Sequence, residues 1–205
     1  MRRLLAAALF AAGAAGAQDP APRLLEAIAA GKEPVAAILV LGGKADLEAR
    51  NAARETPLHL AAEKDMRALT RLLLDAGARV RARTATGETA LHHAALNEDP
   101  AVARLLLEAG ADPRALNDHG ESALHWAAYG GNDAVARLLL ERGADANVFN
   151  LDGNLPLHGA AAGGHAGMVR LLLLGTHAPR LKNLEGKTPA DLARERGHEN
   201  TARLF

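Results

Sequence analysis

The sequence predicts an all-α solenoid of stacked helix-turn-helix units with short β-hairpin fingers. Shifting the 205-residue chain against itself by 33 residues superposes one seven-residue pattern five times without a gap. A fixed period of that length is typical of units that cannot bury their apolar face alone and therefore stack. A leucine-rich amphipathic segment follows four of the copies, and glycines recur at the same spacing. The copies begin at Thr56, Thr89, Ser122, Leu155 and Thr188.

The N-terminal residues predict a secretory signal peptide over residues 1–17. A basic start at Arg2 and Arg3 precedes an apolar run over residues 4–15, and the small residues Ala15 and Ala17 then supply an A-x-A cleavage pattern. We therefore expect a mature chain over residues 18–205 that is exported to the periplasm or secreted, with no membrane span. An alanine-rich amphipathic leader is the alternative interpretation.

Charge and cysteine content narrow the possible functions. The chain carries 24 basic and 24 acidic residues, so it lacks the excess of basic residues that is typical of proteins that bind nucleic acid or an anionic membrane. It contains no cysteine, which excludes thiol catalysis, disulfides and a lipid attachment site.

The elements follow in order from the start of the mature chain. Residues 21–43 predict a helix pair that lacks the seven-residue pattern, and we interpret it as a degenerate capping repeat. Five repeats follow, and the last, with Asp191 in place of the usual histidine, is a C-terminal cap. In these repeats a hydroxyl residue is expected to cap the first helix. Second helices carry leucines three and four apart around a solvent-facing arginine.

Glycines are expected to end the second helices and to form the tips of the fingers. Three departures from the pattern stand out. Arg54 occupies a tip position, where it should cost the finger its easy positive-φ turn. Leu155 replaces a capping hydroxyl, and the segment 174–177 predicts that the second helix of the fourth full unit ends one residue early.

The first copy of the pattern reads Thr56-Pro57-Leu58-His59-Leu60-Ala61-Ala62, and a leucine run and Gly77-Ala78 follow it. This arrangement resembles the ankyrin repeat, and the resemblance covers residues 44–205. It implies a scaffold that binds a protein partner on a concave face made by the finger tips and the exposed side of the first helices. It also implies that the repeated histidine ties a finger to its helix and to the neighbouring repeat.

The four repeated histidines do not form a shared metal site. Equivalent positions in stacked repeats lie about 10 Å apart, whereas zinc ligands lie about 2.0 to 2.1 Å from the ion. These residues are His59, His92, His125 and His158. A site combining His93, His119 and a carboxylate of a neighbouring unit is the metal-binding alternative. The sequence has no catalytic triad, HExxH motif or phosphate-binding loop, so we expect neither enzymatic activity nor a cofactor.

The predicted partner-binding surface centres on the third full unit. Two positions three residues apart on each first helix share one face. At these positions lie Trp126 and Tyr129, the single tryptophan and the single tyrosine of the chain, and both residue types are enriched at binding hot spots. The predicted surface comprises His93, Leu96, His119, Trp126, Tyr129 and Phe149.

The sequence thus predicts a monomeric, non-catalytic protein that binds another protein, and Trp126→Ala is expected to weaken binding with little change in stability. Alternatively, Trp126 and Tyr129 only pad the groove wall. A metal-binding protein and a purely structural, homo-oligomeric scaffold are the alternative functions.

Overall fold

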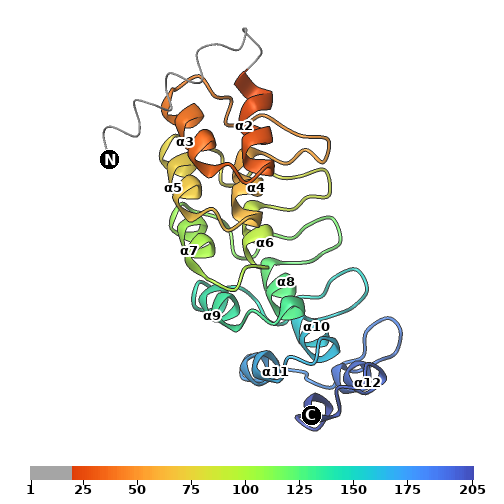
Figure 1. Ribbon diagram of the computed structural model, residues 1–205. Helices are drawn as coiled ribbons and strands as arrows, with labels where there is room; N and C mark the ends of the chain where they lie inside the picture. Colours follow the sequence, from red (N-terminus) through yellow and green to blue (C-terminus); the bar gives the residue numbers. More distant parts are fainter. Residues whose placement is uncertain (1–19) are drawn as a thin grey trace.

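The computed structural model describes residues 20–205, and the predicted signal peptide lies outside the described residues. The described chain is a stack of helix pairs (Figure 1). The pairs are α2 (Pro20–Ala29) with α3 (Glu33–Leu41), α4 (Pro57–Glu63) with α5 (Arg67–Asp75), α6 (Ala90–Ala94) with α7 (Ala101–Glu108), α8 (Ala123–Gly130) with α9 (Asp133–Glu141), α10 (Pro156–Ala162) with α11 (Ala166–Leu173), and α12 (Pro189–Glu195) with α13 (Glu199–Ala202).

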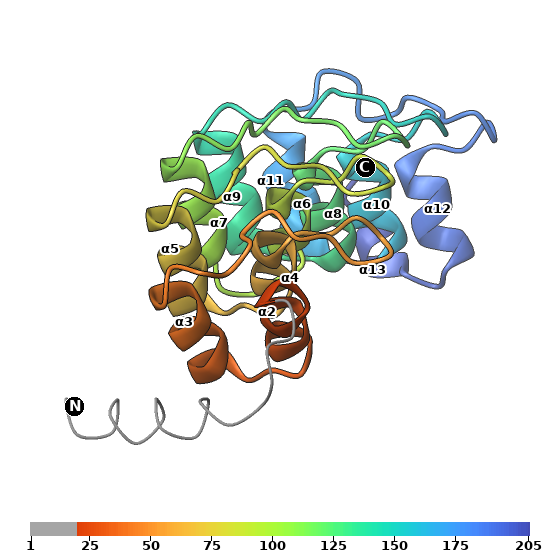
Figure 2. The same ribbon diagram turned by 90° about the horizontal axis from the view of Figure 1, so that it is seen from above.

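The first helices of the pairs form one layer and the second helices another, while the connecting loops project together on one side (Figure 2). Leucines of equivalent positions fill the space between the layers. Leu91 and Leu124 on first helices and Leu106 and Leu139 on second helices are at most 1% exposed. Each such side chain contributes about 1.5–3 kcal/mol by burial. No helix within residues 20–205 has both the length and the apolar character needed to span a bilayer.

The projecting loops form the predicted fingers, although their backbone pairing is minimal. Within residues 20–205 one isolated antiparallel β-bridge forms, between Leu116 and Ser122, and single backbone hydrogen bonds such as that from the N–H of Asn117 to the carbonyl oxygen of Glu121 close the finger turns. Neighbouring fingers are joined edge to edge by backbone hydrogen bonds, and the N–H of Leu151 donates to the carbonyl oxygen of His119 at 2.9 Å. We call the side that carries the fingers and the exposed surface of the first helices the finger face.

Two of the predicted departures are visible. Arg54 adopts the positive φ of a tip residue, 60°, although it is not glycine. Helix α11 ends at Leu173, one residue earlier in the repeat than α9, which ends at Glu141. The predicted early end of this helix is therefore confirmed, whereas the finger at Arg54 keeps its turn in spite of the strain.

The repeated histidines hold the fingers in place. The ring Nδ1 of His92 accepts the backbone N–H of Thr89 at 3.1 Å, and the threonine hydroxyl lies 2.9 Å from the same nitrogen. Because Nδ1 accepts, Nε2 carries the ring proton and donates to the carbonyl oxygen of Glu121 in the next finger at 3.0 Å. His59 and His125 make equivalent bonds.

Burial is the main reason why the pKa of His59 and that of His92 fall from 6.5 to about 4. Both rings are therefore neutral at physiological pH. The neutral charge state agrees with the two-sided clamp, and the hydrogen bonds on both ring nitrogens confirm the structural role of these histidines.

Candidate functional site

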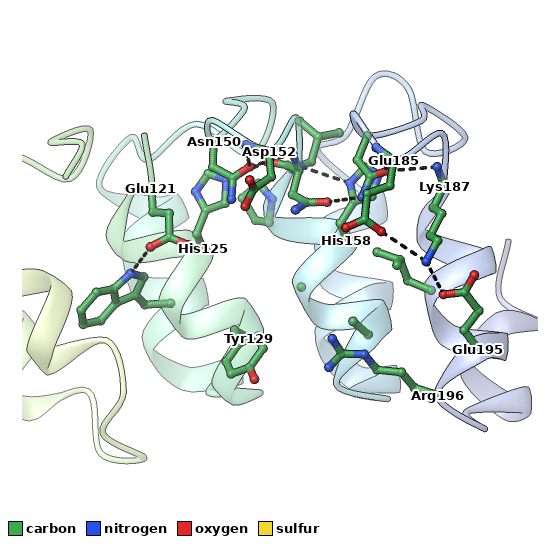
Figure 3. Close-up of a pocket in the computed structure, with 18 of the residues that line it drawn as sticks. Glu121, His125, Tyr129, Asn150, Asp152, His158, Glu185, Lys187, Glu195 and Arg196 are labelled. Carbon is green, nitrogen blue, oxygen red and sulfur yellow. Dashed lines mark hydrogen bonds and ion pairs between the residues drawn. The ribbon is translucent and has the colours of Figure 1, made fainter. Parts of the chain in front are cut away.

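A groove of about 580 Å³ crosses the finger face of the last three units (Figure 3). It begins at Trp126 and Tyr129 on α8, passes over α10, and ends at Leu192 and Arg196 of the final unit. The first helices form its floor, and the fingers form its upper wall.

The groove is hollow because the fourth unit has small residues on its floor. Gly159 occupies the position that is leucine, histidine or tryptophan in the other full units. Ala162 lies one turn further along the same face. A Cβ atom placed on Gly159 would lie 3.6 to 3.7 Å from backbone and Cβ atoms of Tyr129, which is ordinary van der Waals contact. Because Gly159 has no side chain, the floor of the groove is low at this position, and Tyr129 and Leu192 line the same groove.

The rim of the groove is apolar at one end. The side chain of Tyr129 is 62% exposed and that of Leu96 is 50% exposed. The backbone carbonyl of Tyr129 accepts a hydrogen bond from Nε2 of His165 at 3.0 Å, which anchors the end of α8 while the phenol ring stays at the groove edge. An exposed aromatic ring on a rigid helix is a favourable anchor for a partner, because little conformational entropy remains to be lost.

Trp126 is half-buried rather than freely exposed. Its indole N–H donates to Oε2 of Glu121 at 2.9 Å. Its ring packs edge-on against the ring of His92, at a centroid distance of 5.6 Å. It also contacts the ring of His93 in a tilted arrangement, at a centroid distance of 5.8 Å. Because these contacts belong to the fold, we now expect Trp126→Ala to lower stability as well, contrary to the expectation from the sequence.

The finger wall of the groove is polar and mainly acidic. Lys187 occupies the position that is glutamate in the first three full units, and its Nζ lies 2.7 Å from Glu195 and 3.2 Å from Glu185. The carboxylate of Asp152 is exposed and has no hydrogen bond or ion pair in the described chain. Four carboxylates and two cations line the groove, which leaves an acidic excess.

The predicted site residues fall into three groups. Leu96, Trp126 and Tyr129 line the groove. His119 and Phe149 are exposed on the fingers but do not line it. His93 was expected at the surface and is instead only 9% exposed, because the rings of His59 and Trp126 pack against it.

Sequence reasoning missed the floor and the far wall of the groove. Gly159 was visible as a gap in the column of larger residues, and this gap was the signal for a hollow. The acidic and basic residues of the final unit, Glu185, Lys187, Glu195 and Arg196, gave no such signal, because charged residues are common on a capping repeat.

Of the two histidines in the metal-binding alternative, His93 lies close enough to other potential metal ligands to share an ion with them, whereas His119 belongs to no such cluster in the described residues. Among residues 20–205, the cluster whose donor atoms lie close enough for one ion combines His93 with Glu55 and Glu63. It lies in the first two full units and is separate from the groove.

The two layers of helices and the projecting fingers define the class of helical-repeat solenoids. Within that class, the family model described as Ankyrin repeats (3 copies) matches residues 24–117, 87–150 and 124–205. The chain therefore belongs to the ankyrin repeat family. No curated protein matches the sequence. Ankyrin repeats are generally protein–protein interaction modules and are typically non-catalytic.

Proposed function

We propose that this protein binds a segment of a partner protein in the groove of its last three units, without catalysing a reaction. The observation that carries this proposal is the hollow over Gly159 beside the exposed ring of Tyr129. A groove that is already formed loses little conformational entropy when a partner docks, so more of the contact energy remains as affinity.

The lining indicates the chemistry of the bound segment. A large apolar side chain fits over Gly159, between Tyr129 and Leu192, where it loses contact with water. The exposed carboxylate of Asp152 on the finger wall, which has no ion pair in the described chain, favours lysine or arginine beside that apolar residue, since opposite charges across an interface set orientation and specificity. The expected ligand is an extended segment with an apolar anchor and a basic flank.

The cellular setting is part of the same proposal. The signal peptide expected at residues 1–17 supports a protein that is exported and that meets its partner in the periplasm or outside the cell. We further propose that the protein acts as a monomer, because the finger face is then free for a different chain.

Site-specific photo-crosslinking tests the proposal. Tyr129 is replaced by benzoylphenylalanine, which keeps an aromatic ring at the rim and reacts with whatever lies against it. The matched control places the same group at Arg137, which is exposed on the outer helix α9. We expect a discrete adduct with a second protein from position 129 and none from position 137.

Three results would contradict the proposal. Adducts of equal yield from both positions would indicate non-specific contact. An adduct with a second copy of the same chain would favour the homo-oligomeric alternative, which sedimentation at several concentrations would then establish. The absence of any adduct from position 129, in cells that carry the natural partner, would remove the groove as a binding site.

A further inference from the structure

A second cluster of polar side chains lies on the finger face of the first two full units. It combines Glu55, from the finger before α4, Glu63, at the end of α4, and His93 on α6. One donor atom from each of the three residues lies within 4.8 Å of the other two. The cluster therefore joins two neighbouring repeats.

The imidazole of His93 is the unusual member of this cluster. The residue is nine-tenths buried, and its Nε2 is a buried nitrogen without a hydrogen-bond partner. Oε2 of Glu88 lies 4.0 Å away, which is too far for a hydrogen bond. Edge-to-face packing against His59, at a centroid distance of 5.5 Å, holds the ring in place. A buried polar nitrogen of this kind is costly unless something binds it.

The carboxylate of Glu55 is oriented and available. In the third full unit the equivalent Glu121 accepts the indole N–H of Trp126, five residues further on. In the first full unit the residue five positions after Glu55 is Leu60, whose side chain has no hydrogen-bond donor. Asn51 donates to Oε2 of Glu55 at 2.5 Å, which fixes the carboxylate and leaves its other oxygen free. Residues that orient a ligand in this way are typical neighbours of metal sites.

We propose that Glu55, Glu63 and His93 bind a divalent transition metal ion, with zinc as the expected ion. Imidazole nitrogen and carboxylate oxygen are both zinc ligands, and three protein ligands leave a fourth position of the tetrahedron for water. Calcium and magnesium are disfavoured because they bind oxygen ligands rather than imidazole.

The geometry requires a small closure. Ligands about 2.1 Å from a tetrahedral ion lie roughly 3.4 Å apart, so donor atoms now up to 4.8 Å apart must approach one another. Glu63 supplies this movement, because its side chain is exposed and makes no hydrogen bond or ion pair in the described chain. A dication would also offset the negative charge of Glu55, Glu63 and the neighbouring Glu88.

Calorimetric titration of the whole chain with zinc chloride, together with thermal denaturation, tests the site. We expect one ion per chain and a rise in the denaturation temperature when zinc is added. Glu63→Gln should weaken binding at least about tenfold, because even residues that only orient a ligand cost about 10- to 100-fold when mutated. His93→Gln should abolish binding. His119→Gln and Glu98→Gln, which change exposed residues outside the cluster, should leave binding unchanged.

The proposal fails if zinc produces neither heat nor a shift in denaturation temperature. It also fails if Glu63→Gln binds zinc as the unchanged chain does, since Glu63 is exposed and its substitution leaves the fold intact. If magnesium at the same concentration as zinc displaced the zinc, coordination by His93 would be excluded, because magnesium binds oxygen ligands rather than imidazole.

Discussion

Replacing Gly159 by alanine is expected to raise the free energy of unfolding by about 0.5 to 1 kcal/mol. Glycine inside a helix is less favourable than alanine by that amount, and Gly159 lies within α10. The added Cβ would meet its nearest neighbours at 3.6 Å, so it forms ordinary contacts and displaces nothing. For a chain of this length each kcal/mol corresponds to roughly 2 to 4 °C in denaturation temperature.

Gly164→Ala is the matched control. Gly164 has a φ of 72°, and a Cβ there would lie 2.5 Å from Nδ1 of His198. Backbone strain and steric conflict should therefore make this variant less stable. Urea denaturation followed by circular dichroism compares both variants with the unchanged chain. A neutral or destabilising effect of Gly159→Ala would refute the view that the groove floor is open and unstrained.

Gly159→Leu extends the same comparison to binding. Leucine occupies this position in the first full unit and in the last one, as Leu60 and Leu192, so the side chain is compatible with the repeat. We expect it to fill the hollow, to preserve folding, and to abolish crosslinking from position 129. Crosslinking at full yield would show that the hollow is not where the partner docks.

The remaining predictions concern a finger, the histidine clamp and the indole. Arg54→Gly should raise the free energy of unfolding, measured by urea titration, by about 0.5 to 1 kcal/mol, because glycine adopts the positive φ of this position without strain. A lower free energy of unfolding would contradict this. Burial lowers the pKa of His125 and of His158 below 6.5. The folded chain therefore binds fewer protons at these sites than the unfolded chain. The contribution of these histidines to stability should therefore be complete above about pH 6.5 and should decline as the pH falls. Urea denaturation midpoints that stay constant from about pH 7.5 to about pH 5 would contradict this expectation. Trp126→Phe should lower the free energy of unfolding by about 1 kcal/mol, because Glu121 loses the indole donor. Urea denaturation followed by circular dichroism measures this, and an unchanged midpoint would mean that the hydrogen bond does not contribute to stability.

The candidate site was partly predictable. Trp126 and Tyr129 were found because they interrupt a repeat that otherwise uses aliphatic side chains, and both line the groove. The two differ in exposure, however, because Glu121 and the ring of His93 draw the indole against the fold. Their position along the helix did not reveal this difference.

By itself the sequence determined the helix pairs, the glycines that end the second helices and the turns at the finger tips. The expected hydroxyl cap forms at Thr188, whereas the hydroxyls of Thr56, Thr89 and Ser122 contact the repeated histidine instead. These features depend on residues within a few positions of one another, and the 33-residue period repeats the same local chemistry in every unit. Tertiary structure decided the burial of His93, its approach to Glu55 and Glu63, and the hollow over Gly159. These features depend on how side chains about 30 residues apart in the sequence meet across the stack. The distances between such side chains are set by the packing of whole repeats against one another.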